Sequence, residues 1–341
     1  MKALALKYRP KDFDDLVEQG PIKQILEEQV KTSTHQNAYL FTGGAGTGKT
    51  TSARIMANEL NKGEGNPIEL DAASNNSVND VREIIIDSKF KSLDSEYKIY
   101  ILDECHMFST GAWNALLKLF EEPPAKSVFI LCTTDPQKIP ATIISRVQRF
   151  DFKRISYNGI IDRLEYILQE EMKEDAELIY NKEAIHYIAK LADGGMRDAI
   201  TLLDKCISYD PELTVEKVIE ALGSINYDTM HALTISICEK DIKEAIIILE
   251  QIYREGLDLK QFIKQYSYFI LDICKYNLLG NFEYLQVPAT LEENFKKITP
   301  EQSQIIYGLL NELVEINNII KWEPSPKPII QTSLMLFIEG I

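Results

Sequence analysis

The chain has 341 residues, of which 45% are hydrophobic and 26% are charged, an ordinary composition for a globular protein with room for two or three domains. Its formal net charge of −15 at pH 7 excludes a protein that coats nucleic acid non-specifically, because phosphate contacts need clustered Lys and Arg. Any contact with nucleic acid is therefore expected to be local, or shared with other chains.

The apolar runs are too short for a membrane protein. No stretch approaches the ~18 apolar residues of a membrane span, and Lys7 and Arg9 interrupt the N-terminus before a signal-peptide core can form. The five cysteines are far apart and form no CxxC pair, which favours buried thiols in a reducing compartment. We expect a cytoplasmic protein without a membrane partner.

Residues 1–156 alternate short apolar runs with amphipathic stretches, which is typical of a parallel α/β sheet. The expected strands span residues 38–42, 68–71, 98–103, 128–133 and 147–152. Apolar residues at helical spacing predict helices over residues 22–30, 78–86 and 113–120. We expect this α/β domain to cover residues 1–156.

Strand signals are absent from residue 157 onward. Helices are expected at residues 159–169, 182–191, 196–207 and 214–222, with Gly194-Gly195 as a break before the third. From about residue 227 long apolar-periodic runs indicate further helices, and the polar break "WEPSPKP" precedes a last segment at 329–338. The expected domains are a small helical domain at 157–224 and an all-helical domain at 225–341.

A phosphate-binding pattern lies between the first predicted strand and the following helix. "LFTGGAGTGKTTSA" contains G-x-x-x-x-G-K-[ST], in which glycines let backbone N–H groups approach phosphates at a helix N-terminus. Lys49 is predicted to pair with the β- and γ-phosphates, and the Thr50 hydroxyl to bind Mg²⁺. The predicted nucleotide-binding residues are Gly43, Gly44, Ala45, Gly46, Thr47, Gly48, Lys49, Thr50 and Thr51. The alternative is a glycine-rich turn that binds nothing.

Two adjacent carboxylates end the third predicted strand. In "KIYILDECH", Asp103 and Glu104 stand at the C-terminal end of a buried strand, where ligands bind in open α/β sheets. Asp103 suits a role at Mg²⁺, and Glu104 suits polarising an attacking water. The pair favours hydrolysis of a nucleoside triphosphate over a kinase reaction. The alternative is a solvated acidic turn.

Three further features narrow the class. Thr133 and Thr134 end a strand, where they suit sensing of the γ-phosphate. Arg146 in "IISRV" follows a short helix on the rim of the domain, and Arg197 in "GGMRDAI" opens a helix of the second domain. An arginine that reaches the γ-phosphate from a neighbouring chain raises the rate ~10³–10⁵-fold where this has been measured. A single arginine is more often a surface ion-pair partner, but the three features in this order favour a nucleotide-driven machine.

Taken together, these motifs resemble the clamp-loader branch of the AAA+ ATPases, above all the gamma/tau subunits of bacterial DNA polymerase III. The resemblance is dense from residue 5 to about residue 206, and it rests on "ALKYRPKDFDDLVEQ", "GGAGTGKTTSARIMA", "IELDAASNNSVNDVREI", "YILDECHMFSTGAWNALLKLFEEPP", "TTDPQKIPATIISR" and "GGMRDAITLLDK". It implies an α/β AAA+ module, made of a parallel-sheet P-loop domain and a small helical lid, followed by an all-α collar domain.

The resemblance also implies roles for single residues. Thr134 (or Thr133) corresponds to the sensor 1 residue of the family, Arg146 to the arginine finger and Arg197 to the sensor 2 residue. With Lys49 and Glu104 they form the implied catalytic set, and Thr50 and Asp103 are the implied Mg²⁺ ligands. The implied adenine-pocket residues are Tyr8, Arg9, Pro10 and Val17.

The chain departs from the family pattern at three places. The family usually carries a four-cysteine zinc module before "DAAS", but here the interval is only "NKGEGNP", so zinc is not expected. Val147 follows the finger arginine where the family has cysteine. Asn75 and Asn76 occupy a stretch where a basic residue commonly helps to hold DNA.

The function implied by the resemblance is that of an ATPase motor subunit with ATP and Mg²⁺ as cofactors. ATP binding is expected to open and hold a ring-shaped sliding clamp, and primed DNA to trigger hydrolysis and clamp closure. The implied partners are other clamp-loader subunits in a pentameric oligomer, the sliding clamp and primed DNA. The alternatives are a replication-factor-C-like small subunit and a clamp-loader subunit with a mainly structural role. A protein unfoldase is disfavoured, because "AASNNSVND" lacks an aromatic pore residue.

Overall fold

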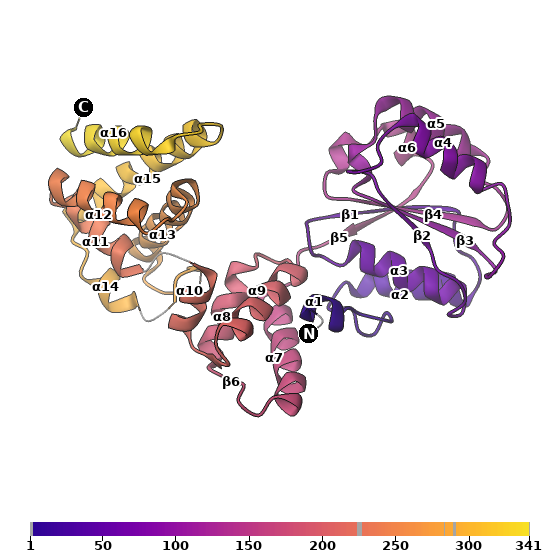
Figure 1. Ribbon diagram of the computed structural model, residues 1–341, viewed down its shortest axis with the longest axis horizontal. Helices are drawn as coiled ribbons and strands as arrows, with labels where there is room; N and C mark the ends of the chain where they lie inside the picture. The colour runs from indigo at the N-terminus through magenta and orange to yellow at the C-terminus, as the bar shows by residue number, and fades with distance from the viewer. Residues whose placement is uncertain (1–2, 224–226, 283, 289–290, 341) are drawn as a thin grey trace. The chain divides into compact units, whose positions relative to one another are not determined.

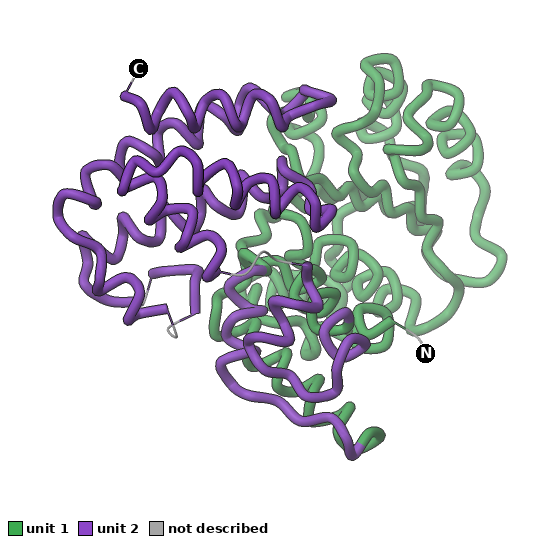
Figure 2. Tube along the Cα trace, turned by 60° about the vertical axis from the view of Figure 1, so that its left-hand side comes forward, with its two compact units in different colours: residues 1–175, 192–204 green, residues 176–191, 205–341 purple. Residues whose placement is uncertain are grey.

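The computed structural model describes residues 3–223, 227–282, 284–288 and 291–340. The chain forms two compact units, one of residues 1–175 with 192–204 and the other of residues 176–191 with 205–341 (Figure 2). The expected domain boundaries at residues 156 and 224 stay a prediction. Within the described residues no helix is long and apolar enough to cross a membrane.

The first unit is built on a parallel five-stranded sheet with the strand order β2-β3-β4-β1-β5. All five predicted strands are confirmed to within one residue. Their bounds are β1 Ala38–Gly43, β2 Ile68–Asp71, β3 Lys98–Asp103, β4 Ser127–Thr133 and β5 Gln148–Phe152. Every residue of β4 is buried, as expected for a central strand of a parallel sheet that is covered on both faces.

Helices cover both faces of this sheet, α4, α5 and α6 on one and α2 and α3 on the other (Figure 1). Alternate residues of each strand belong to the cores on the two faces of the sheet, because successive side chains of a strand point to opposite faces. Leu40 and Leu102 pack with α4 and α5, whereas Phe41 and Ile101 pack with α2 and α3. The helical bounds in this unit are α1 Leu4–Lys7, α2 Gly20–Lys31, α3 Lys49–Leu60, α4 Val78–Asp87, α5 Thr110–Glu121, α6 Ala141–Ile144 and α7 Tyr157–Glu174, with 3-10 turns η1 Cys105–Met107 and η2 Pro136–Lys138.

The second unit is mainly helical, as predicted. Helix α9 (Met196–Tyr209) begins in the first unit and ends in the second. The other elements of the second unit are α8 Lys182–Leu191, α10 Val215–Leu222, α11 Tyr227–Cys238, α12 Ile242–Arg254, α13 Leu259–Leu279, α14 Glu292–Lys296, α15 Pro300–Ile320 and α16 Pro326–Glu339, with strands β6 Ile179–Tyr180 and β7 Glu212–Leu213. Its core surrounds α13, whose Phe262, Tyr266 and Phe269 are almost fully buried.

Two expectations for this unit were wrong in detail. The strands β6 and β7 pair in parallel, although no strand was expected after residue 157. Each has two residues, too few to show the alternation by which a strand is recognised. Helix α16 begins at Pro326, inside the expected polar break, because proline is tolerated in the first turn of a helix.

A buried carboxylate holds a loop of the second unit. Asp272 of α13 is 1% exposed, and its Oδ2 accepts hydrogen bonds from the backbone N–H groups of Gln286 at 2.6 Å and Val287 at 2.9 Å. Its Oδ1 accepts from Lys275 Nζ at 3.2 Å. Removal of this side chain would leave the buried N–H of Val287 and the partly buried N–H of Gln286 without an acceptor.

We predict that Asp272→Ala lowers the free energy of unfolding of the second unit by about 2–3 kcal/mol, because unsatisfied buried donors are costly. Hydrogen exchange at the amides of Gln286 and Val287 would then become faster. Asp272→Asn keeps one carbonyl acceptor and is the matched control, with a smaller loss. Unchanged exchange in Asp272→Ala would show that the loop does not depend on this carboxylate.

Candidate nucleotide-binding site

The predicted phosphate loop joins the C-terminal end of β1 to the first turn of α3. Two of its glycines are required by the backbone. A Cβ on Gly43 would lie 2.4 Å from the carbonyl oxygen of Phe152, and Gly46 has a left-handed φ of +69°. The sequence therefore allows a tight loop whose N–H groups border a helix N-terminus, the geometry that favours a bound anion.

Lys49, the first residue of α3, lies inside this loop. It is 6% exposed, and its Nζ donates to the carbonyl oxygens of Gly43 at 2.9 Å and Gly44 at 2.7 Å. Burial lowers the pKa of its ammonium group from the ordinary value, although Glu104 and Asp103 nearby act in the opposite direction. A desolvated cation at this position favours a negatively charged ligand.

Thr50 and Asp103, predicted Mg²⁺ ligands, are brought together by the fold. The Thr50 hydroxyl donates to Asp103 Oδ2 at 2.9 Å, which joins α3 to the end of β3. A hydroxyl and a carboxylate are the hard oxygen donors that suit Mg²⁺, so the residues fit this ion. Across the described residues no three His, Cys, Asp or Glu side chains form a metal-binding group. The expectation of no zinc stays a prediction.

Glu104 and Thr134 meet although they are thirty positions apart. The Thr134 hydroxyl donates to Glu104 Oε2 at 3.0 Å, and Thr133 Oγ1 accepts from the backbone N–H of Asp135 at 3.0 Å. Glu104 adopts a left-handed φ of 46°, which is unusual for a residue other than glycine. The carboxylate is therefore held at the carboxyl edge of the sheet, next to the loop that carries Lys49.

His106 is a member of this cluster that the sequence reasoning missed. Its Nδ1 lies 3.0 Å from Thr133 Oγ1 and 3.3 Å from Glu104 Oε2. The quoted "DECH" contains it, but no spacing signal indicates that a residue in a short turn contacts the end of the next strand.

Arg197 lies beside the phosphate loop because the backbone around it packs against that loop. The N–H of Met196 donates to Gly46 O at 3.0 Å, and a Cβ on Gly46 would lie 3.1 Å from the Cα of Gly195 and 3.3 Å from the N of Arg197. These residues belong to the first unit, and the Arg197 side chain is exposed. The predicted break at Gly194-Gly195 is thus the point at which the chain packs against the loop.

Arg146 lies at the opposite edge of the sheet. It stands two positions before Gln148, which pairs with Tyr39 at the start of β1, whereas Gly43 pairs with Phe152. Four residues of strand, roughly 13 Å, separate these pairs. The fold therefore does not bring Arg146 to the phosphate loop of its own chain.

The predicted adenine-pocket residues lie in two places: Tyr8 contacts α7, whereas Val17 belongs to a segment beside the phosphate loop. Tyr8 donates its hydroxyl proton to Glu171 Oε1 of α7 at 2.5 Å, and Arg163 donates to the Tyr8 carbonyl at 3.0 Å. Arg9, Pro10 and Val17 are partly buried.

The residue before Val17 places this part of the arm beside the phosphate loop. Leu16 Cδ2 is 3.8 Å from the position that a Cβ of Gly48 would take. Gln19 then fixes the segment to Lys153, with its side-chain amide donating to the carbonyl at 2.7 Å and accepting from the N–H at 3.2 Å. The segment around Val17 thus lies beside the phosphate loop, and its role as an adenine-pocket wall stays a prediction.

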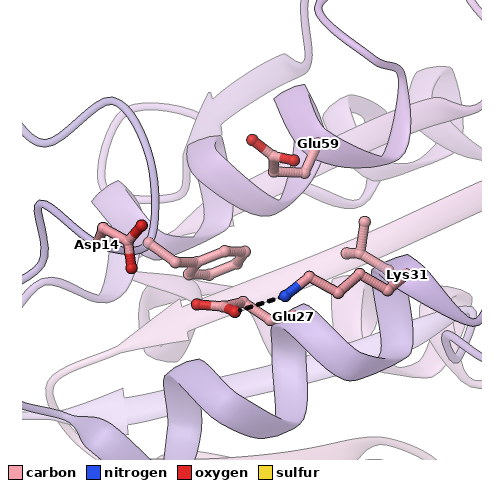
Figure 3. A pocket seen from close by; sticks show the side chains of 6 residues that line it. Asp14, Glu27, Lys31 and Glu59 are labelled. Carbon is pink, nitrogen blue, oxygen red and sulfur yellow. Dashed lines mark hydrogen bonds and ion pairs between the residues drawn. The ribbon is translucent and has the colours of Figure 1, made fainter.

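A separate pocket lies at the other end of α3 (Figure 3). It has a volume of 180 Å³ and is lined by Phe13, Asp14, Glu27, Val30, Lys31 and Glu59. Lys31 is already paired with Glu27 at 3.0 Å. With three carboxylates and no residue of the phosphate loop, this pocket does not suit a nucleotide.

The buried ammonium of Lys49 leads to a prediction about stability. Because the fold lowers its pKa, the unfolded chain binds this proton more tightly, and the charge opposes folding below the ordinary pKa. We expect Lys49→Met to raise the free energy of unfolding, because it removes this buried charge. We also expect ATP to raise the melting temperature of the unmodified chain, and this increase should be lost in the variant. A less stable variant, or one that ATP still stabilises, would contradict this account.

Comparison with known proteins places these features in a family. Residues 66–156 match the family described as DNA polymerase III, delta subunit, and residues 159–210 match the ATPase lid domain of the DNA polymerase III clamp loader subunit. The chain is 36% identical to the tau subunit of DNA polymerase III from Bacillus subtilis, over 96% of this chain and 61% of that protein. It is 31% identical to the gamma subunit from Buchnera aphidicola, over 99% of both chains.

Two further comparisons define the limits of this similarity. The chain covers 51% of the Escherichia coli tau subunit at 30% identity, so it spans about half to three fifths of these two tau subunits. The solved Thermotoga maritima RuvB branch migration motor superposes with a TM-score of 0.52 at 18% identity, over 74% of this chain and 86% of that one. This similarity shows a shared P-loop ATPase fold. On its sequence, the chain belongs to the gamma/tau subunit family of DNA polymerase III.

Proposed function

We propose that this chain is an ATP-hydrolysing motor subunit of a DNA polymerase clamp loader. The observation that carries the proposal is the convergence of Lys49, the Thr50–Asp103 pair and the Glu104–Thr134 pair at one edge of the sheet. Family membership supports the same function. The intact set disfavours a mainly structural subunit, which has no need of a positioned Glu104.

The phosphate loop and Lys49 bind the triphosphate in this proposal. Backbone N–H groups of the loop donate to phosphate oxygens, and Lys49 exchanges its two carbonyl acceptors for the β- and γ-phosphates. Thr50 and Asp103 would hold Mg²⁺, which would supply positive charge against the phosphates during hydrolysis. The segment around Val17 borders the adenine, with Tyr8, Arg9 and Pro10 in the adjoining arm.

Glu104 orients the attacking water and accepts its proton. Thr134 fixes the carboxylate by a hydrogen bond of 3.0 Å, which limits the positions that the carboxylate can take. Arg197 approaches the γ-phosphate from the segment that packs on Gly46, so that the state of the loop and the position of α9 are coupled. Arg146 acts in a neighbouring subunit, because its own phosphate loop lies at the other edge of the sheet.

ATP serves as a switch for conformation and partner affinity in this proposal. The bound state holds the sliding clamp open within an oligomer of clamp-loader subunits, pentameric by resemblance to the family. Primed DNA then triggers hydrolysis, and the clamp closes around it. We further propose that residues 157–224 act as the lid and residues 225–341 as the collar, and that the chain works in the cytoplasm without zinc.

We predict that Glu104→Gln lowers the rate of ATP hydrolysis at least about a hundredfold, because it removes the group that accepts a proton from water. Affinity for ATP should stay within about threefold, since Lys49 and the loop are unchanged. Hydrolysis would be followed by phosphate release, and binding by fluorescence of a labelled ATP analogue. Glu122→Gln, the same change at an exposed glutamate, is the control. If hydrolysis survives in Glu104→Gln, the active site has been assigned to the wrong carboxylate.

A further inference from the structure

The guanidinium of Arg146 is held by contacts within its own chain. Its Nε and Nη2 donate to Glu121 Oε1 at 3.1 and 2.6 Å, and its Nη1 donates to Thr142 O at 2.7 Å and Ser145 Oγ at 3.1 Å. A guanidinium has five N–H donors, so these contacts use four and leave one, on Nη2. These contacts favour one orientation of the side chain before any partner arrives.

We propose that Glu121 is a positioning residue that presents Arg146 to the nucleotide of a neighbouring subunit. This inference rests on the proposed function, in which Arg146 acts across an interface. Glu121 does not touch the nucleotide in this scheme. It acts only through the guanidinium, whose remaining Nη2 N–H is directed by the bonds that fix the other donors.

The two residues are carried by packed elements rather than by free loops. Glu121 is the last residue of α5, which ends before Pro123, and Arg146 follows Ser145, the residue after α6. The backbone N–H of Arg146 donates to Ile143 O at 2.9 Å, which continues the turn of α6. The C-terminal end of α5 also carries partial negative charge, which favours a cation beside it.

A purely stabilising role explains this arrangement poorly. The side chains of Arg146 and Glu121 are 33% and 49% exposed, and ion pairs as exposed as this one contribute little to stability. The ion pair instead restricts the conformations of the Arg146 side chain. A free arginine loses rotamer entropy when it reaches across an interface to a phosphate, whereas one already ordered loses little at that moment.

Glu121 acts here through its hydrogen-bond acceptor and not through its negative charge. A carboxylate beside the guanidinium opposes the approach of a phosphate, so the useful property of Oε1 is its position as an acceptor of two N–H bonds. Glu121→Gln keeps an acceptor oxygen and removes the charge. Glu121→Ala removes both, and it frees the guanidinium.

The test uses two variants of the full chain in one assembly with companion subunits, sliding clamp and primed DNA. One variant, Glu104→Gln, supplies a finger but does not hydrolyse ATP. The other, Arg146→Ala, supplies an intact hydrolytic site without a finger. Their mixture should hydrolyse ATP faster than either variant alone, because the finger of the first completes the site of the second.

Adding Glu121→Ala to the finger-supplying variant should lower the rate of the mixture about tenfold, by analogy with small misplacements of positioned groups. Adding it to the Arg146→Ala variant should have no effect, because that chain has no finger to position. Glu121→Gln in the finger-supplying variant should restore the rate to within about threefold. Glu122→Ala, an equal loss of charge at the next residue, is the control, and thermal unfolding of each variant checks the fold.

The outcomes separate the inference from the function on which it rests. If the mixture hydrolyses ATP but Glu121→Ala in the finger-supplying variant leaves or raises its rate, Glu121 does not position Arg146 and the inference is overturned, while the proposed function stands. The inference is also overturned if Glu121→Ala lowers the rate of ATP hydrolysis equally in the finger-supplying variant and in the Arg146→Ala variant. If the mixture is no faster than its components, Arg146 does not act across an interface and both proposals fail.

Discussion

The parallel adjacency of β3, β4 and β1 is the constraint on which the rest of the site depends. In this order the carboxyl ends of three neighbouring strands lie side by side, with Leu102 opposite Leu131 and Thr42 opposite Thr133. Each strand is followed at that edge by residues with separate chemistry. Asp103 is the last residue of β3 and Glu104 follows it, Thr134 follows β4, and the phosphate loop follows β1. Burial of both faces of the sheet keeps this register fixed.

Two arginines differ in their distance from the phosphate loop of their own chain: Arg197 lies close to it and Arg146 lies far from it. Arg197 belongs to a segment that packs on the phosphate loop through Gly46 and Met196, and in the proposed function it serves the nucleotide of its own chain. Arg146 precedes β5 and lies at the amino edge of the sheet, where its guanidinium is bound by Glu121. An arginine that is ordered but distant from its own phosphate loop suits action in an assembly. In the proposed function, a single copy therefore carries a hydrolytic site and a separate arginine finger that acts in a neighbouring subunit.

Much of this arrangement was predictable from local sequence patterns. The central strands β1, β3 and β4 follow from apolar runs of four or five residues, and the phosphate loop from glycines and a lysine at fixed spacing. The contacts that complete the site were not predictable in this way. The bonds of Glu104 to Thr134 and of Arg146 to Glu121 join residues thirty and twenty-five positions apart, on elements whose packing decides the contact. His106 and the short strands β6 and β7 were missed because a residue in a turn and a two-residue strand carry no periodic signal.

The central claim is that ATP hydrolysis by this chain serves clamp loading, and the steady-state rate tests it most directly. The rate would be measured for the chain reconstituted with companion subunits and sliding clamp, with and without primed DNA. The account predicts strong stimulation by primed DNA that depends on the clamp and is lost in Arg146→Ala. A rate that responds to neither clamp nor DNA would contradict the account, and would leave an ATPase whose client is a different molecule.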